Sequence, residues 1–359
     1  MAGYWVRNIL LHDFQIHHKR ERKFRLTNIA LLSAAHIHTR GFLEEISKRD
    51  DCSLVALWDD MADRGTRYAE EYGAAFSGDL DSVVGRQDVD AFIICAENTR
   101  HLPLLKAAIP VGKPIFCEKP FTALTADAAE ALALTRAHDT IVHMGYFQPF
   151  DGVMQGVKKM IDSGALGQIT HARFRNAHHA AYGHWFDSED LAWFSNPDLA
   201  GGGAFMDMGA HAVHLLRSFI GTVDSVTATI GNASGIYSAV DDHGIALFRF
   251  ANGVLGTVEA SWVQTGGIGG LEVTGSEGTL FNHPQLGYVV AAPGKDTQPV
   301  EEAPALPTRV ERLLAAVRGE ISREELNEDL QYSADAVAII DACYASSSSG
   351  SWVNVEKLG

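Results

Sequence analysis

The sequence has few cysteines, no long apolar run and no excess of positive charge. Its four cysteines lack C-x-x-C spacing, which argues against disulfide or zinc–cysteine frameworks and favours a reduced, cytoplasmic chain; they are Cys52, Cys95, Cys117 and Cys343. No apolar run reaches the ~18 residues that a membrane helix needs, so no membrane association is expected. Acidic residues number 45 against 29 lysines and arginines, and a formal charge of −16 disfavours a nucleic-acid partner. A small neutral or weakly charged ligand suits this composition better.

The N-terminal residues do not read as part of a folded domain. In residues 1–25 a basic cluster follows a short apolar stretch, which reverses the order of a secretory signal. We expect a disordered extension here, with a contact arm as the alternative. The 359 residues are enough for two domains, each with its own core.

From residue 26 onward, short apolar segments alternate with helical ones. Apolar runs of β type occur at 26–32, 54–58, 89–96, 115–117 and 140–144. Helical segments separate them at 39–48, 62–72, 102–109 and 126–138. Strands that are apolar on both faces and alternate with helices are typical of a parallel sheet covered on both sides. Residues 26–148 are therefore predicted to form a Rossmann-type, doubly wound α/β domain.

The pattern changes after residue 148. Predicted strands, joined by turns with glycine and asparagine, lie at 169–175, 223–230, 245–250, 254–263, 271–274 and 288–291. Several of them alternate apolar and polar residues, as a sheet with one covered face does. Helices are expected at 153–162, 209–219, 308–318 and 327–346. Residues 149–359 are thus predicted to form an α+β domain with a large, mostly antiparallel, open-faced sheet and last helices that can pack back on the first domain.

The first strand-to-helix turn lacks the glycines of a dinucleotide-binding loop. Where that motif reads G-x-G-x-x-G, this chain reads Ser33-Ala34-Ala35-His36-Ile37-His38. Small residues at the first two glycine positions still permit the backbone to approach a pyrophosphate, whereas His38 replaces the third glycine. The motif alone does not indicate a cofactor, and loss of nucleotide binding is an open alternative.

An acidic pair ends the second predicted strand, about 25 residues past the loop. In nucleotide-binding folds, an acid at this position accepts hydrogen bonds from the adenosine ribose. Asp59 is the candidate, and Asp60 follows it. Because two carboxylates without an adjacent base repel a 2′-phosphate, NAD is predicted in preference to NADP.

Longer motifs carry a resemblance to a known family. Residues 112–120 read GKPIFCEKP, residues 89–101 read VDAFIICAENTRH, and residues 201–211 read GGGAFMDMGAH. They resemble the glucose–fructose oxidoreductase, inositol dehydrogenase and MocA family, and the resemblance extends from about residue 26 to the C-terminus. It implies a Rossmann domain followed by an open-sheet domain, NAD or NADP as cofactor, and sugar or cyclitol substrates. It also implies a homodimer or homotetramer built through the open sheet.

The resemblance assigns site residues by position. Lys119, Asp207 and His211 match the family's catalytic residues. The predicted cofactor-binding set is Ser33, Ala34, Ala35, His36, Ile37, Asp59, Glu97, Asn98, Thr99, His101, Glu118, Lys119 and Gln148. The chain departs from the family pattern in the loop at 33–38 and at Phe147-Gln148, where an Asn-Arg-like pair is common.

The chemistry of the three catalytic candidates agrees with this assignment. Oxidation of a hydroxyl needs a base for the O–H proton while the hydride leaves, and the imidazole of His211 suits that role. Asp207 precedes it by four residues, so on a helix its carboxylate can orient the ring or raise its pKa. Lys119 follows the strand at 115–117, and its ammonium can stabilise a developing alkoxide.

Aromatic and imidazole side chains are predicted to line the substrate pocket. A loop after a second-domain strand carries His178 and His179, and Trp193 precedes the glycine run. Such groups stack on sugar C–H faces and bind hydroxyls. The predicted substrate-side set is Lys119, Tyr146, His178, His179, Trp193, Asp207 and His211. Because no H-x₃-H or HExxH spacing occurs, no metal site is predicted.

The sequence therefore favours NAD-dependent interconversion of a secondary hydroxyl and a ketone on a sugar, sugar derivative or cyclitol. One alternative is a lyase, hydratase or glycosidase that keeps NAD tightly bound and performs no net redox reaction. A second alternative is a regulatory protein that senses a sugar or a dinucleotide on the same scaffold.

Overall fold

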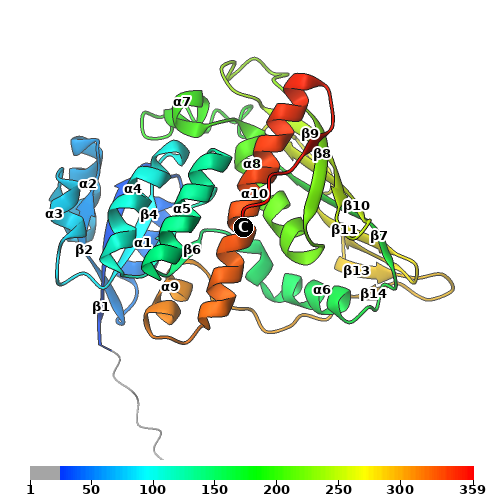
Figure 1. Cartoon of the computed structure of the whole chain (residues 1–359), viewed down its shortest axis with the longest axis horizontal. Coiled ribbons are helices and arrows are strands. Elements are labelled where there is room, and N and C mark those ends of the chain that lie inside the picture. The colour runs from blue at the N-terminus through cyan, green and yellow to red at the C-terminus, as the bar shows by residue number, and fades with distance from the viewer. Residues whose placement is uncertain (1–24) are drawn as a thin grey trace, which may run out of the picture.

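Two sheets organise residues 25–359, the part of the chain that the computed structural model describes. The extension expected over residues 1–25 lies outside this part, apart from its last residue. Figure 1 shows the smaller sheet and its helices on the left, the larger sheet on the right, and α10 (Arg323–Ser349) running between them. Within residues 25–359, no helix is both long and apolar enough to cross a membrane.

The first sheet has six parallel strands in the order β3-β2-β1-β4-β5-β6. Its strands are β1 (Thr27–Ala34), β2 (Cys52–Trp58), β3 (Ala75–Ser77), β4 (Ala91–Cys95), β5 (Ile115–Cys117) and β6 (Val142–Met144). The helices between them are α1 (Thr39–Ser47), α2 (Ala62–Tyr72), α3 (Leu80–Val84), α4 (His101–Ala108) and α5 (Thr125–His138). The predicted Rossmann-type architecture is confirmed, although β3 and α3 were not predicted. The strand order reverses between β1 and β4, and ligands of such folds bind in the crevice outside the carboxyl ends of these strands.

The second sheet has nine strands in the order β14-β13-β12-β11-β7-β10-β9-β8-β15. These are β7 (Ile169–Ala177), β8 (Val223–Gly231), β9 (His243–Phe250), β10 (Leu255–Ser261), β11 (Gly270–Gly275), β12 (Thr279–His283), β13 (Gly287–Ala291), β14 (Gln298–Pro299) and β15 (Val353–Asn354). Only β7 and β10 pair in parallel, so the predicted, mostly antiparallel sheet is confirmed. The sequence did not predict β12, β14 or β15.

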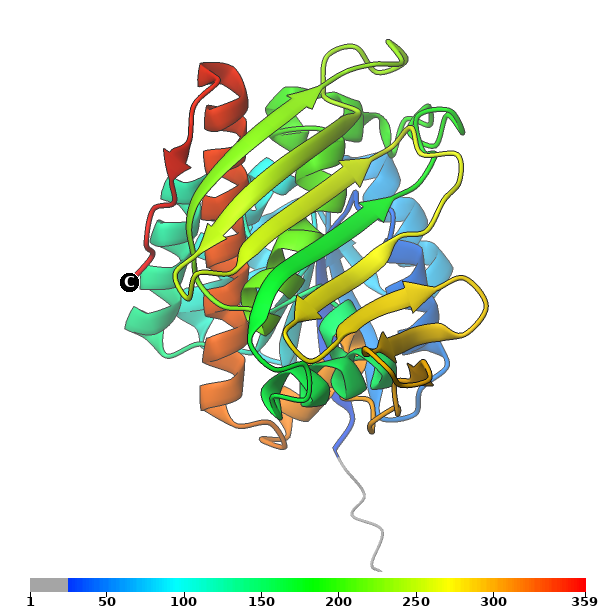
Figure 2. The ribbon, with the colours of Figure 1, turned by 90° about the vertical axis from the view of Figure 1, so that its right-hand side faces the viewer.

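Helices cover one face of this sheet and leave the other open. Helix α8 (Ala204–Phe219) packs on β7, β9 and β10, and α10 packs on β8. Along β9, buried residues alternate with exposed ones, as the half-covered sheet requires. Figure 2 views the sheet from its outer side, where no helix of the described chain lies in front of its central strands.

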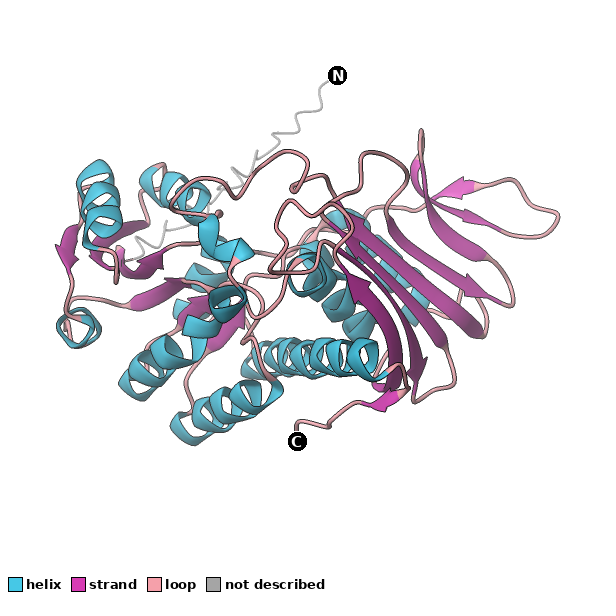
Figure 3. Ribbon diagram, turned by 90° about the horizontal axis from the view of Figure 1, so that it is seen from above, coloured by secondary structure: helices cyan, strands magenta, loops and turns pink. Residues whose placement is uncertain are grey.

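The last helices join the two halves. Helix α9 (Arg309–Val317) contacts α1 and β5, and α10 contacts α5 and β6 as well as α8 and β8. From above, Figure 3 shows helices on both faces of the first sheet and a further group of helices between it and the second sheet. The remaining helices are α6 (Gly152–Asp162) and the short α7 (Pro197–Ala200). This arrangement places the start of α8 next to the carboxyl edge of the first sheet.

Candidate active site

A carboxylate outside the sequence motifs sets the start of α8. Asp241 accepts hydrogen bonds from the backbone N–H groups of Gly203 (2.8 Å) and Phe205 (2.7 Å). A Cβ atom at Gly203 would lie 1.9 Å from the Asp241 carbonyl oxygen, so only glycine permits this approach. The helix therefore starts at a defined point and presents Asp207 and His211, one turn apart, on one face.

A cavity of about 260 Å³ lies where α8 meets the first sheet; we call it the Lys119 pocket. Side chains from both halves of the molecule line it: Ile37, His38, Lys119, Phe147, Gln148, Asn176, His178, Trp185, Phe186, Phe194, Asp207, Met208 and His211. The structure thus brings the three catalytic candidates to one cavity, with aromatic walls of the kind that bind small ligands.

Lys119 and Asp207 form an ion pair in this pocket. The Lys119 ammonium bonds Asp207 Oδ1, and the indole N–H of Trp262 donates to Asp207 Oδ2 at 3.0 Å. The ammonium side chain is 4% exposed and the carboxylate 13%. Burial alone would raise the pKa of Asp207, but the Lys119 charge and these two hydrogen bonds hold that pKa well below its usual range. The carboxylate is therefore charged and positions the ammonium.

His211 has no such partner. The expectation that Asp207 orients its ring is not met in this structure, because both carboxylate oxygens bond other groups and His211 Nδ1 is buried without a hydrogen bond. Its ring instead lies edge-on to Tyr146 and Phe147, with centroids 5.7 Å away in each case. Burial, followed by the Lys119 charge, lowers the pKa of His211 to about 3. The imidazole is therefore neutral near pH 7, as a proton acceptor must be.

The turn after β1 keeps the shape of a nucleotide loop without its glycines. Ser33, at the first glycine position, has φ of +69°, in the left-handed region that glycine adopts easily. The next residue, Ala34, donates its backbone N–H to Asp59 Oδ2 at 2.7 Å. Ala35 is 1% exposed, because the indole N–H of Trp193 donates to its carbonyl oxygen at 3.0 Å. The left-handed residue at the start of the turn is therefore kept without a glycine, and Trp193 covers the turn.

Asp59 does not present a free carboxylate to the crevice. It is 1% exposed and also accepts hydrogen bonds from the Met61 N–H and the Arg64 guanidinium. The prediction that no base lies beside this acidic pair is wrong, since Arg64 pairs with both Asp59 and Asp60, and Arg100 pairs with Asp60. The acidic pair therefore no longer supports a ribose-binding role for Asp59, nor does it support a preference for NAD over NADP.

The other predicted cofactor residues on this side bond the protein itself. Glu97 is buried within 3.7 Å of the Arg64 guanidinium. Asn98 donates to the Ala200 carbonyl oxygen (2.8 Å), and Thr99 donates to that of Asp198 (3.0 Å). His101 is fully buried, with ring nitrogens near the Pro120 and Ala96 carbonyl oxygens.

The acceptors of Asn98 and Thr99 belong to residues 188–200, which we call the cover segment. This segment includes Trp193 and α7, and its Asp190 pairs with Arg67 on α2. It lies against the carboxyl ends of β1 and β4, where the pyrophosphate and adenosine of a dinucleotide would bind. The residues present therefore fit the nicotinamide end of a dinucleotide, and they fit the adenosine end only if the cover segment moves away.

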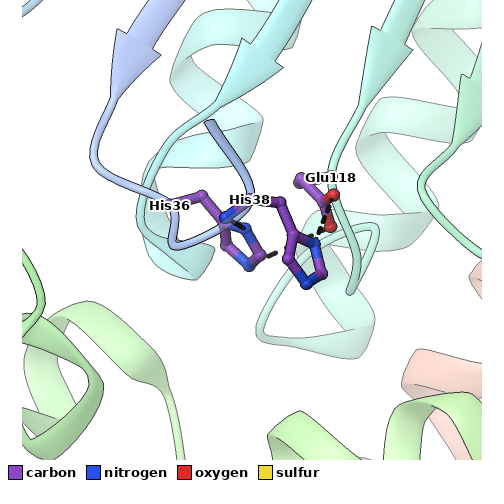
Figure 4. Close-up of side chains that lie close together, drawn as sticks. All are labelled: His36, His38 and Glu118. Carbon is purple, nitrogen blue, oxygen red and sulfur yellow. Dashed lines mark hydrogen bonds and ion pairs between the residues drawn. The ribbon is translucent and has the colours of Figure 1, made fainter. Parts of the chain in front are cut away.

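Glu118 lies in a cluster with two histidines, His36 and His38. His38 Nδ1 lies 2.9 Å from Glu118 Oε1, and His36 Nε2 lies 3.9 Å from Glu118 Oε2 (Figure 4). Burial would raise the pKa of Glu118, but the two imidazoles and Lys119 hold it well below its usual range. Burial also lowers the pKa of His36.

The substrate-side predictions divide between the Lys119 pocket and its surroundings. His178 lines the pocket, whereas His179 lines an adjoining cavity of about 380 Å³ that shares His178 with it. Tyr146 is 2% exposed behind His211, and Trp193 packs on the turn after β1. Sequence reasoning missed Trp262 and Asn176. No motif signals them, because Trp262 directly follows β10, Asn176 lies on β7, and the pairing of these strands brings them to the site.

Comparison with known families agrees with this architecture. Residues 28–146 match the oxidoreductase family with an NAD-binding Rossmann fold, and residues 154–281 match the GFO/IDH/MocA C-terminal domain. The chain belongs to this family. The predicted resemblance is thereby confirmed, and the GFO/IDH/MocA assignment accounts for the order of the two domains.

Relatives of the chain act on sugars. It is 26% identical over 299 residues to a 1,5-anhydro-D-fructose reductase of Ensifer adhaerens, covering 80% of this chain and 88% of that one. It is 27% identical to a 2,7-anhydro-N-acetylneuraminate hydratase of Mediterraneibacter gnavus, over 56% of this chain and 52% of that one. Among solved structures, an inositol dehydrogenase homologue from Azotobacter vinelandii, complexed with NAD⁺, superposes with a TM-score of 0.78. That match has 19% identity, spans 92% of this chain and 97% of the other, and shows the shared fold.

Proposed function

We propose that this GFO/IDH/MocA member is an NAD-dependent oxidoreductase that interconverts a secondary hydroxyl and a ketone on a sugar, sugar derivative or cyclitol. The single observation that carries the proposal is the meeting of Lys119, Asp207 and His211 at one cavity beside the carboxyl edge of a Rossmann sheet. Sugar-acting relatives support the substrate class.

Each of the three side chains has a distinct part in the proposed reaction. Neutral His211 accepts the proton of the substrate hydroxyl, since it lines the pocket beside Lys119 and Asp207 does not engage its ring. The ammonium of Lys119 stabilises the negative charge that develops on the same oxygen. Asp207 keeps that ammonium in place, and Trp262 keeps the carboxylate in place. A bound nicotinamide would supply the hydride acceptor, with Ile37, Lys119 and Gln148 lining its end of the site.

An NAD⁺ reduction screen tests this proposal. Inositols, monosaccharides, sugar acids and anhydrosugars are offered to the full chain, and NADH absorbance is followed. With the best substrate, His211→Ala should lower kcat by ~10²–10⁴-fold, because the base is gone. Turnover of that variant close to wild type would remove His211 from the mechanism.

A second candidate function is favoured by the closed cover segment. A dinucleotide held beneath residues 188–200 exchanges slowly, which suits an enzyme that oxidises and re-reduces its substrate within one turnover. A hydratase relative is consistent with such chemistry. Product analysis without added NAD⁺ separates the two, since only the second candidate converts substrate catalytically under that condition. Failure of NAD⁺ and NADH to bind in calorimetry at millimolar concentration would instead favour a sensing role.

The open sheet face is the proposed surface for self-association. Ile245, Leu247 and Leu255 on β9 and β10 are each about half exposed on the uncovered side of the sheet. Apolar residues gathered on one open face favour a homodimer or homotetramer. Light scattering after gel filtration gives the mass directly, and a monomeric mass for both wild type and Leu247→Glu would contradict the proposal.

A further inference from the structure

Two histidines and a glutamate meet beside the Lys119 pocket, and one of them, His38, lines it. His36 and His38 come from the turn after β1, and Glu118 follows β5, about 80 positions later. One ligand atom from each lies within 4.8 Å of the other two. Within residues 25–359, this is the one group of three or more His, Cys, Asp or Glu side chains gathered closely enough to hold a metal ion. Figure 4 shows both rings and the carboxylate turned toward one another.

Hydrogen bonding within the cluster does not account for all three members. Glu118 Oε1 is 2.9 Å from His38 Nδ1, but His36 Nε2 is 3.9 Å from the carboxylate and is buried without any partner. An unpaired buried polar atom is unfavourable, and each one calls for a ligand, a water or an ion. The side chain of His36 is 1% exposed and aims this atom into the cluster.

The surroundings hold the cluster in place. The His36 ring packs against the stacked pair Trp193 and Phe194, with centroids 6.0 and 5.8 Å away. The backbone N–H of Lys119 donates to Glu118 Oε2 at 2.9 Å. A Cβ atom at Gly145 would lie 2.8 Å from the same oxygen, so the glycine leaves room for the carboxylate. These contacts resemble the outer shell that orients the ligands of metal sites.

We propose that His36, His38 and Glu118 bind a divalent transition metal ion such as Zn²⁺, with one coordination position open toward the Lys119 pocket. Two imidazole nitrogens and one carboxylate form the donor set of catalytic zinc sites, which leave a position free for water or substrate. Tetrahedral ligands at 2.0–2.2 Å from zinc lie about 3.3 Å apart. The histidine nitrogens lie 2.9 Å from Glu118 Oε1 and 3.9 Å from Glu118 Oε2, and all three ligand atoms are within 4.8 Å of one another, so small side-chain shifts bring them to that spacing.

The open position faces the pocket because His38 lines it together with Lys119. A divalent ion there would carry a net positive charge after the Glu118 carboxylate is counted, beside an ion pair that is already neutral. It would bind an oxygen-bearing ligand, such as a hydroxyl or carboxylate of the substrate, as a Lewis acid. The metal site therefore adds a second electrophilic group to the pocket, and its test needs neither cofactor nor substrate.

Ligation changes two existing contacts. The metal replaces the hydrogen bond between His38 Nδ1 and Glu118 Oε1, because both side chains become its ligands. His36 Nδ1 accepts the His38 backbone N–H at 3.2 Å, which leaves the proton of the neutral ring on Nε2. A metal bound at Nε2 replaces that proton, and the ring proton then lies on Nδ1, so the backbone contact must open. The proposal thus predicts a small rearrangement of the turn when metal binds.

Metal uptake by the full chain tests the proposal without cofactor or substrate. The chain is dialysed against a chelator and then buffer, and titrated with Zn²⁺ by calorimetry and with Co²⁺ by visible absorption. We expect one equivalent per chain and the d–d bands of a four- or five-coordinate cobalt site. His38→Ala and Glu118→Gln should each weaken binding at least tenfold and abolish the bands.

Matched controls separate this site from other histidines. His184 and Asp187 form an exposed pair at 3.1 Å, so His184→Ala removes an ordinary imidazole–carboxylate contact and should leave metal uptake unchanged. His17 and His18 adjoin in the sequence, and their double substitution by alanine should also bind normally. Circular dichroism checks that His38→Ala folds, with His38→Gln as the second variant.

Two results would overturn the proposal. One is a wild-type chain that takes up no Zn²⁺ or Co²⁺, and the other is metal uptake that His38→Ala and Glu118→Gln leave intact. Neither result depends on NAD⁺ reduction, so the metal site and the oxidoreductase proposal fail or stand separately.

Discussion

The two ends of the crevice outside β1 and β4 differ sharply. At the nicotinamide end, Lys119, Asp207 and His211 face a cavity of about 260 Å³. At the adenosine end, Asp59 and Glu97 are buried around the Arg64 guanidinium, and Trp193 covers Ala35. One end therefore keeps polar groups available for a ligand, while the other satisfies its polar groups within the protein.

Because of this difference, substrate binding and cofactor exchange depend on different parts of the crevice. The pocket can hold a small substrate with the chain as it stands, whereas a dinucleotide must displace the cover segment and compete with its hydrogen bonds. Binding energy used to open the segment lowers the apparent affinity for the cofactor. The cover segment can therefore affect the cofactor in two ways. It either holds the dinucleotide tightly so that it exchanges slowly, or it makes dinucleotide binding weak, and substitutions at each end of the crevice distinguish these cases.

The largest effect is expected at the open end. Asp207→Ala leaves the Lys119 ammonium buried without its carboxylate, and breaking such a pair destabilises a protein by roughly 3–5 kcal/mol. Turnover should fall as well, since the ammonium is no longer held at the reacting oxygen. Urea unfolding and NADH production measure the two effects. Asp162→Ala, which breaks the exposed Lys158–Asp162 pair, should cost less than about 1 kcal/mol. Equal losses in the two variants would contradict the assignment.

At the closed end, Trp193→Ala should uncover the crevice. Truncating a buried tryptophan costs about 3 kcal/mol or more, and the cover segment loses its bond to the Ala35 carbonyl oxygen. NADH should then enter and leave faster, as followed by stopped-flow fluorescence. Trp352→Ala is the control, because Trp352 is 41% exposed, packs on Arg249 of β9 and does not line the Lys119 pocket. Exchange rates that respond equally to both substitutions would mean that the cover segment does not gate the crevice.

The sequence predicted the open end better than the closed one. Strands that are apolar on both faces, and two motifs about 90 residues apart, were enough to anticipate both sheets and to propose Lys119, Asp207 and His211. Partnerships were harder to predict: Asp207 at i and His211 at i+4 share a helix face, yet Lys119 and Trp262 take the carboxylate. Helix periodicity predicts neighbours within one helix, whereas Lys119 and Trp262 belong to other segments of the chain.

The closed end depended on contacts between distant segments. Asn98 and Thr99 sit at positions that read as cofactor contacts, but their acceptors are carbonyl oxygens about 100 residues later. Arg64 lies five residues after Asp59, and its guanidinium turns inward to reach both Asp59 and Glu97. A motif identifies the position of a polar side chain, but it does not reveal whether another group of the protein already bonds that side chain.

A buried imidazole beside the open end should make stability depend on pH. His143 lies on β6, next to β5, facing Arg312 and Asp329; burial, followed by the Arg312 charge, lowers its pKa to about 3. The unfolded chain binds a proton near pH 6.5 and the folded chain does not, so stability falls as pH drops below 6.5. Between pH 6.5 and pH 5 this group alone should contribute a loss of about 2 kcal/mol. Urea unfolding of His143→Leu should show a shallower decline than wild type, and parallel declines would contradict the expectation.

The smallest effect probes the attachment of the cover segment. Thr99→Val removes one hydroxyl bond to the Asp198 carbonyl oxygen, which should cost only about 0.5–1.5 kcal/mol. Thr170→Val is matched to it, since Thr170 donates in the same way to the Thr274 carbonyl oxygen within the second sheet. Both variants should lose similar stability, but only Thr99→Val should speed NADH release, because of the two bonds only that of Thr99 holds the cover segment. If Thr170→Val speeds release to the same extent, release follows global stability and the closed end is not a separate gate.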